Sequence, residues 1–290
     1  MSLAHSNIEP ADVLLSAHDL RKSFAPLHRG TEQNCQSTFG VKGVTFDIAR
    51  GETLGVVGES GCGKTTLARL LLRLLPPDGG SMTFDGQDWL AARGRPLRAL
   101  RRRIQIIFQD PATSLNPRIC AEELLAEPLA IQEPRMNRAA CRDRVVEMLR
   151  AVGMDESALR RFPHEFSGGQ RQRLSIARAL ILHPALIVAD EPVASLDVSI
   201  GAQVLDLLKR LKREFHLTLL LISHSLPVVA EMADRVAVMR AGAFVELAST
   251  DVLFRAPQHP YTRELLDAVP ILPPFQPLER QTAADLPADG

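Results

Sequence analysis

The stretch "TLGVVGESGCGKTTLARLLLRLL" at residues 53–75 decides the fold. It begins as an apolar run of strand length, passes through a glycine-rich turn and continues with apolar residues at helical spacing. The turn, from Gly58 to Thr65, fits the pattern G-x-x-x-x-G-K-[ST] in the strand–helix context that this pattern requires. The stretch therefore predicts a strand, a phosphate-binding loop and a helix in direct succession.

The turn predicts a site for a nucleotide and Mg²⁺. Its glycines let the backbone wrap a β-phosphate, Lys64 can reach the β- and γ-phosphates, and the Thr65 hydroxyl can ligate Mg²⁺. An ordinary strand–helix connection is the alternative, which the full spacing disfavours. The nucleotide-binding residues predicted here are Gly58, Glu59, Ser60, Gly61, Cys62, Gly63, Lys64, Thr65 and Thr66.

A pair of carboxylates follows a second apolar run, "LIVADE" at 186–191. Asp190 stands at the end of the predicted buried strand, where it can hold a metal ion through water. Glu191 beside it can orient and deprotonate an attacking water. The alternative is an acidic pair that caps the next segment, but the upstream phosphate-binding loop favours catalysis.

A second anion site is predicted in "FSGGQRQRLSIARAL" at 166–180. Leu174, Ala177 and Ile181 recur at helical spacing, and Ser-Gly-Gly begins the helix. Such a helix start leaves backbone N–H groups that can bind an anion. The chain therefore carries two predicted phosphate sites.

The composition excludes several classes of protein. The 34 basic and 34 acidic residues of the 290 balance, so no basic field favours a nucleic-acid partner. The four cysteines form no C-x-x-C pair, which disfavours zinc, iron–sulfur and disulfide frameworks and indicates a reducing compartment. The start lacks the pattern of a signal peptide, and no apolar run reaches the roughly 18 residues that span a bilayer. We expect a cytoplasmic chain whose membrane association comes through a partner.

The order of segments predicts an α/β fold. Strand and helix patterns alternate, which predicts a largely parallel sheet with helices on both faces. Strand-like residues from Leu14 to Ile48 are interrupted by a polar insert at about 25–40, interpreted as a loop. Strand signals stop over about 111–166, which predicts a helical insertion. We expect one domain over residues 11–272, followed by a Pro-rich polar tail at 273–290.

"FSGGQ" at 166–170 resembles the signature motif of ABC-transporter ATPases. The remaining motifs of that family follow in the expected order: Gln109 resembles the Q-loop glutamine, "SLD" at 195–197 the D-loop, and His224 the switch histidine. The resemblance covers about residues 13–250. It implies a P-loop ABC ATPase with a parallel-sheet core, an N-terminal antiparallel β subdomain and a helical insertion, which hydrolyses ATP with Mg²⁺.

The resemblance also implies roles for single residues. Two such domains dock head to tail, so the start of the signature helix would hold the γ-phosphate of the partner's ATP. The residues implied for catalysis are Glu191, His224 and Gln109. The residues implied for Mg²⁺ are Thr65, Gln109 and Asp190. Further residues implied for the nucleotide are Phe24, Ser167, Gly168, Gly169, Gln170 and Asp197.

Three of these assignments have simpler alternatives. Gln109 could be a polar strand end, His224 a helix cap or surface histidine, and Phe24 a strand residue of the core instead of an adenine-stacking ring. Ser225 follows His224 where the family commonly has Asp, which leaves the switch histidine itself in place.

Two further stretches narrow the branch of the family. "FQDPATSLNPR" at 108–118 and "APQHPYTRELLDAVP" at 256–270 resemble segments of oligopeptide, dipeptide and nickel importer ATPases, of which the second or F type is the most similar. Tyr261, the single tyrosine, is interpreted as a packing anchor for a C-terminal helix. Some relatives carry a cysteine cluster near this end, but no cysteine follows Cys141, so we expect no iron–sulfur centre.

The resemblance implies a set of partners. They are a second ABC ATPase subunit, which would make a heterodimer, two membrane permease subunits and, indirectly, an extracytoplasmic solute-binding protein, without nucleic acid. The chain would lie peripherally on the cytoplasmic face of the inner membrane, and its helical insertion would receive a coupling helix. The solute, peptide or nickel, stays open. The alternatives are a soluble ABC ATPase acting on nucleic acid or ribosomes, and a subunit of a phosphonate-processing complex.

Overall fold

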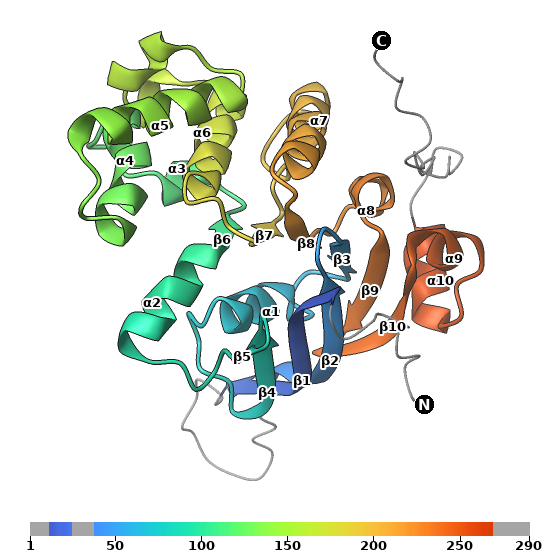
Figure 1. Cartoon of the computed structure of the whole chain (residues 1–290). Helices are drawn as coiled ribbons and strands as arrows, with labels where there is room; N and C mark the ends of the chain where they lie inside the picture. The colour runs from blue at the N-terminus through green and yellow to red at the C-terminus, as the bar shows by residue number, and fades with distance from the viewer. Residues whose placement is uncertain (1–11, 25–37, 269–290) are drawn as a thin grey trace, which may run out of the picture.

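In the computed structural model, residues 12–24 and 38–268 are described, and they form two β-sheets flanked by helices (Figure 1). The strands are β1 (Val13–Phe24), β2 (Thr38–Ala49), β3 (Thr53–Val57), β4 (Gly79–Phe84), β5 (Gln87–Asp88), β6 (Ile104–Ile107), β7 (Leu186–Asp190), β8 (Thr218–Ile222), β9 (Arg235–Arg240) and β10 (Ala243–Ser249). The helices are α1 (Lys64–Leu71), α2 (Gly94–Arg103), α3 (Pro111–Ser114), α4 (Ala121–Gln132), α5 (Arg138–Ala151), α6 (Gly168–Leu180), α7 (Val198–Glu214), α8 (Leu226–Met232), α9 (Thr250–Arg255) and α10 (Pro260–Asp267).

The larger sheet has the strand order β10-β9-β3-β8-β7-β6. Its strands are parallel except β10, which pairs with β9 in the antiparallel sense. Every residue of β3, β7 and β8 is buried. Such continuous apolar strands are typical of a parallel sheet covered on both faces. The predicted parallel-sheet core is confirmed.

Two apolar cores lie on opposite faces of this sheet. The helical core contains residues of α4, α5, α6 and α7, and the β core contains residues of β1, β2, β4 and α1. Successive residues of one strand point to opposite faces. Accordingly, Leu219 and Leu221 of β8 belong to the helical core, whereas Leu220 and Ile222 belong to the β core.

The smaller sheet is antiparallel, with the order β2-β1-β4-β5, and is the predicted N-terminal β subdomain. The loop predicted over about 25–40 is wrong at its C-terminal end. There β2 already begins at Thr38, which pairs with Phe24, while Phe39 pairs with Ser23. Backbone pairing with β1 thus extends the strand into the segment that the sequence assigned to the loop. Residues 25–37 of that insert lie outside the described residues.

The segment between Pro111 and Phe166 forms α3, α4, α5 and two short 3-10 helices, Glu156–Arg160 and Pro163–Glu165. Together with α6 these helices gather at one end of the molecule, away from β1, β2 and β4 (Figure 1). The Asn137 side chain begins α5 by accepting a hydrogen bond from the backbone N–H of Ala140 at 2.8 Å. No helix in the described part of the chain is long and apolar enough to cross a membrane. The predicted tail at 273–290 lies outside that part.

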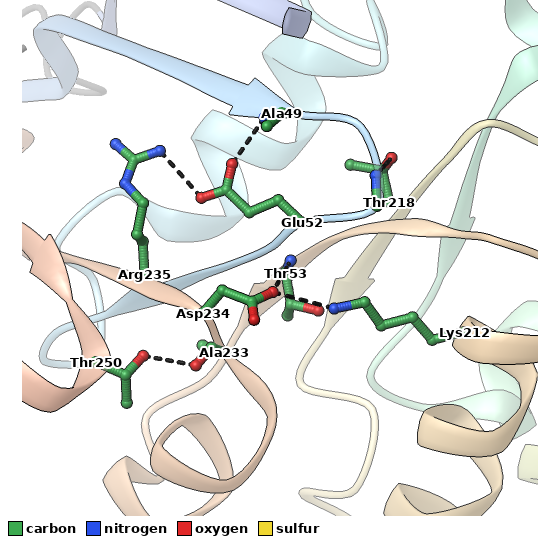
Figure 2. Close-up of polar contacts among 10 residues, drawn as sticks. Ala49, Glu52, Thr53, Lys212, Thr218, Ala233, Asp234, Arg235 and Thr250 are labelled. Atoms are coloured by element: carbon green, nitrogen blue, oxygen red, sulfur yellow. Dashed lines mark hydrogen bonds and ion pairs between the residues drawn. The ribbon is translucent and has the colours of Figure 1, made fainter. Parts of the chain in front are cut away.

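A cluster of polar contacts joins the two sheets at the start of β3 (Figure 2). Glu52 accepts hydrogen bonds from the backbone N–H of Ala49 at 2.7 Å and from Arg235 Nη1 at 3.0 Å. Asp234 accepts one from the backbone N–H of Thr53 at 2.7 Å. Because Ala49 ends β2 and Arg235 begins β9, these bonds fix β3 between both sheets at the end opposite to the phosphate-binding loop.

Candidate active site

The phosphate-binding loop runs from the end of β3 to the start of α1, where the sequence predicts it. Lys64 is buried, and its ammonium group donates hydrogen bonds to the carbonyl oxygens of Gly58 at 2.6 Å and Glu59 at 2.9 Å. Three N–H donors on one ammonium can bind several oxygens at once. Lys64 is therefore held inside the phosphate-binding loop by loop carbonyl oxygens, and its ammonium group is also expected to bind phosphate oxygens.

Two glycines let the loop lie directly against neighbouring strands. Gly58 has φ 153°, and a Cβ there would lie 2.1 Å from the carbonyl oxygen of Met239. Gly63 has φ 115°, and a Cβ there would lie 2.0 Å from the carbonyl oxygen of Gly40. Any larger residue at either position would push the loop away from β9 or β2. Glycine is thus required at these two positions by the packing of the loop against the strands, in addition to its predicted role in phosphate binding.

Cys62, in the same loop, is a packing residue in this structure. Its thiol is buried, and burial raises the pKa of the thiol, although the nearby Lys64 charge opposes that shift. A thiol with a raised pKa stays protonated and is a weak nucleophile. Its backbone carbonyl accepts a hydrogen bond from the N–H of Gly242 at 2.8 Å, which ties the loop to the β9–β10 turn.

A cleft of 540 Å³ opens over this loop. It is lined by Phe24, Gly40, Ser60, Gly61, Gly63, Lys64, Thr65, Thr66, Gln109, Glu191 and His224. The structure therefore brings the predicted catalytic residues together with most of the phosphate-binding loop. The ring of Phe24 is 40% exposed at this cleft, so it is accessible to a planar base.

The three predicted catalytic side chains meet at Glu191. Its Oε2 lies 2.8 Å from His224 Nδ1 and accepts a hydrogen bond from Gln109 Nε2 at 3.4 Å. Glu191 has φ 49°, an uncommon conformation for a residue other than glycine. Its backbone N–H donates to the carbonyl oxygen of Ile222 at 2.8 Å, so pairing with β8 stabilises this turn. The arrangement suits a general base whose carboxylate is oriented by two neighbours.

Asp190 fits a Mg²⁺ site together with Thr65. Burial raises the pKa of the Asp190 carboxyl, and so does the neighbouring Glu191 charge, while a hydrogen bond with the Thr65 side chain and the Lys64 charge act against them. Its Oδ1 is buried with no hydrogen-bond partner in the described structure. An unpaired carboxylate oxygen beside a hydroxyl is a suitable ligand pair for a divalent cation that also binds phosphates. Among the described residues no group of three or more His, Cys, Asp or Glu side chains could hold a metal ion.

The second predicted anion site does not join this cleft. Ser167 caps α6 by accepting a hydrogen bond from the N–H of Gln170 at 3.3 Å, and Gln170 Oε1 accepts one from the N–H of Ser167 at 3.1 Å. A Cβ on Gly169 would lie 2.6 Å from the Ile200 side chain, so glycine lets α6 approach α7. Gly168 and Asp197 also lie outside the cleft lining. Within one chain the two sites are separate.

Sequence reasoning missed one contact of the loop. Tyr261, interpreted as a packing anchor, is buried as expected, but its hydroxyl oxygen also accepts a hydrogen bond from the backbone N–H of Glu59 at 3.3 Å. The Arg240 guanidinium lies 4.5 Å from the centre of the Tyr261 ring. The only sequence signal for this contact is that the single tyrosine of the chain occurs in the "HPYT" segment at 259–262.

The comparisons with known proteins agree with this geometry. The ABC transporter family matches residues 41–194, and the family described as oligopeptide/dipeptide transporter, C-terminal region, matches residues 245–287. The oligopeptide transport ATP-binding protein OppF of Salmonella typhimurium is 48% identical over 282 residues, which cover 96% of this chain and 84% of that protein. The putative oligopeptide transport ATP-binding protein YkfD of Bacillus subtilis is 50% identical over 234 residues, covering 81% of this chain and 71% of that protein.

Solved structures share the fold. The post-hydrolysis dimer of the ATP-binding cassette MJ0796, bound to ADP and Pi, has a TM-score of 0.71 at 27% identity and covers 81% of this chain and 98% of that one. CbiO1 from Clostridium perfringens, part of the ABC transporter complex cbiONQ, has a TM-score of 0.72 at 25% identity and covers 89% of this chain and 96% of that one. With the phosphate-binding loop, the carboxylate pair and these relatives in agreement, the chain belongs to the ATP-binding subunits of ABC transporters and is an ATPase.

Proposed function

We propose that this chain is one of two ATPase subunits that energise a peptide importer, bound to the cytoplasmic face of a membrane through permease subunits. The observation that carries the proposal is the presence of two features in one chain. Residues 41–194 match the ABC transporter family, and residues 245–287 match the C-terminal region of oligopeptide/dipeptide transporters. The similarity to OppF and YkfD, both described as oligopeptide transport proteins, supports the same assignment.

The cleft residues supply the chemistry of ATP hydrolysis in this proposal. Lys64 and the loop N–H groups bind the phosphates, and Phe24 stacks on the adenine. Glu191 accepts the proton of the attacking water, with His224 and Gln109 holding its carboxylate in place. Thr65 and Asp190, with Gln109 at the cleft edge, would hold Mg²⁺, which neutralises phosphate charge when it is bound.

The separate position of the signature helix supports a two-subunit site. The N-terminus of α6 and the exposed Asp197 lie outside the cleft of their own chain. A helix start with available N–H groups binds anions well. We place Ser167, Gly168, Gly169 and Gln170 against the γ-phosphate of ATP held by a second ATPase subunit, so closure of the pair completes each site.

A groove between β6 and the helical insertion is the proposed site for a short helix of a permease subunit. The groove has a volume of 190 Å³, and its walls include Phe108 and Ile131, which are 38% and 50% exposed. Arg178 Nη2 donates to Glu127 Oε2 at 2.8 Å in the same wall. An apolar groove rimmed by an ion pair suits an amphipathic helix with a polar edge.

The experiment is to tag the chain in its native cell, extract membranes with mild detergent and identify the proteins that copurify. We expect two multi-spanning proteins and a second ATPase. Ile131→Glu, which places a charge in the groove, should lose the multi-spanning proteins and retain ATP binding. Val252→Glu is the matched control, because Val252 is 47% exposed on α9 and does not line the groove.

Other outcomes would overturn the proposal. Recovery of the chain with ribosomes, nucleic acid or soluble enzyme subunits would leave the ATPase chemistry in place and exclude peptide import. Recovery with permeases whose binding protein carries nickel would change the solute and keep the transport role.

A further inference from the structure

We propose that Tyr261 is a positioning residue for ATP binding: its hydroxyl orients the Gly58–Glu59 peptide group and, through it, Lys64. The proposal requires ATP binding, which the family membership provides, and does not depend on peptide import.

The argument begins with one peptide plane. The carbonyl oxygen of Gly58 accepts a hydrogen bond from Lys64 Nζ at 2.6 Å, and the N–H of Glu59 donates to the Tyr261 hydroxyl at 3.3 Å. These two groups belong to the same planar peptide unit and point in opposite directions. Lys64 and Tyr261 therefore hold the two sides of a single plane, so rotation of that plane breaks both bonds.

Gly58 makes this second attachment necessary. At φ 153° it has the backbone freedom of a residue without a Cβ, so its own conformation restrains the plane weakly. The β9–β10 turn holds the other end of the loop, where the N–H of Gly242 donates to the carbonyl oxygen of Cys62. Tyr261 supplies the corresponding restraint at the beginning of the loop.

Tyr261 is itself fixed from three sides. It is 2% exposed, its ring lies 4.5 Å from the Arg240 guanidinium, and its backbone N–H donates to His259 Nδ1 at 3.1 Å. The carboxylate of Glu246, in β10, accepts hydrogen bonds from the N–H groups of Gln258 at 2.8 Å and His259 at 3.0 Å. These bonds hold the start of α10 on the larger sheet, so the hydroxyl has one position relative to the loop.

Apart from Arg240, the residues that hold Tyr261 in place lie within residues 245–287. This is the segment that matches the C-terminal region of oligopeptide/dipeptide transporters. This region is thus attached to the phosphate-binding loop by a direct hydrogen bond, across 202 residues of sequence. Tyr261 does not line the cleft, so it acts on the nucleotide only through the loop.

The test is Tyr261→Phe, which keeps the ring and removes only the oxygen. Without its acceptor, the Gly58–Glu59 peptide can rotate and Lys64 loses its fixed position in the ground state. We expect the KM for ATP and the Kd for ATP to rise about three- to tenfold, the usual effect of one lost hydrogen bond, with kcat within about twofold. Leu253→Ala is the matched control: it truncates a buried side chain of α9, so it should lower the Tm and leave the KM unchanged.

A second measurement needs no variant. In the full wild-type chain the amide proton of Glu59 should exchange with solvent more slowly than that of the exposed Ser60, because it is hydrogen-bonded. Equal exchange of the two amides would overturn the proposal. So would a KM within about twofold of wild type in Tyr261→Phe, or an equal rise of KM in Leu253→Ala.

Discussion

The carboxylate of Glu191 and the imidazole of His224 lie 2.8 Å apart, from Oε2 to Nδ1, at the ends of two neighbouring parallel strands. The side chain of Glu191 is 15% exposed, whereas that of His224 is 60% exposed. The carboxylate that we propose as the base is therefore partly shielded from water, while the His224 imidazole is exposed at the cleft.

Glu191→Gln should abolish ATP turnover and preserve ATP binding. The amide keeps the size of the side chain but cannot accept a proton, so kcat should fall by about a hundredfold or more. ATP hydrolysis and equilibrium ATP binding are the measurements. Glu231→Gln is the control, because Glu231 is an exposed carboxylate that pairs with Lys209 on the surface. Retained turnover in Glu191→Gln would contradict the assigned base.

His224→Ala should lower kcat by about tenfold or more and change the Kd for ATP little, because in the described structure the imidazole contacts the Glu191 carboxylate and orients it. Steady-state kinetics with a separate binding titration test this. Ser225→Ala should behave as wild type, since the Ser225 side chain does not cap α8. Equal losses in the two variants would indicate a general disturbance of the turn.

Asp190→Asn should remove the effect of Mg²⁺ on ATP affinity. Wild type is expected to bind ATP about tenfold more tightly with Mg²⁺ than with EDTA, and the variant equally in both, because a neutral amide is a poor Mg²⁺ ligand. Binding titrations in the two buffers measure this. Asp206→Asn, on the exposed face of α7, is the control. A full Mg²⁺ effect in Asp190→Asn would exclude Asp190 from the metal site.

Asp190→Asn should also raise the free energy of unfolding at neutral pH when nucleotide is absent. Burial raises the pKa of Asp190 above its usual value. A raised carboxyl pKa means that the unfolded state ionises first, so the free energy of unfolding falls as pH rises from about 4 through the folded pKa. The asparagine removes this loss. Urea unfolding should therefore show a higher midpoint for Asp190→Asn at about pH 7 and a smaller difference at about pH 4.

Glu246→Gln should loosen the start of α10. Two backbone N–H groups donate to the two carboxylate oxygens, and an amide can accept only one of them. We expect the free energy of unfolding to fall by about 1–2 kcal/mol at about pH 7. Glu264→Gln, exposed on α10, is the control and should change little.

The pH dependence of this effect follows from the pKa of Glu246. Burial acts to raise that pKa, but the hydrogen bonds from the N–H groups of Gln258 and His259 outweigh it, and the pKa is lowered. A lowered pKa gives stability that is present above the usual value of about 4.3 and is lost as pH falls through the folded pKa. Wild type and Glu246→Gln should therefore converge in acid, and a gap that persists there would contradict the role of the charge.

Local patterns predicted the phosphate-binding loop and the order of strands and helices. The phosphate-binding loop can be recognised from the spacing of its glycines and Lys64 alone, because its backbone conformation depends on residue types within a few positions. Asp190, Glu191 and His224 could be placed because each lies at or just after the end of a buried apolar strand, and the ends of neighbouring parallel strands meet at one edge of the sheet.

Contacts between distant segments could not be predicted in this way. Glu246 is a buried carboxylate in β10, where it accepts hydrogen bonds from two N–H groups of the turn before α10. Tyr261 reaches Glu59 across 202 residues of sequence, with its ring beside Arg240 at the end of β9. Thr38 and Phe39 become strand residues only through pairing with β1. In each case the deciding partner is far away in the chain, where a local pattern carries no information.

The alternation along β8 also has an evolutionary consequence. Leu219 and Leu221 pack in the helical core, whereas Leu220 and Ile222 pack in the β core. Neighbouring positions of the same strand therefore contact different sets of residues. Substitutions that change volume in one core are compensated by residues of that core, and distant sites without shared partners act independently. The two faces of the sheet can therefore diverge at different rates among descendants of this chain.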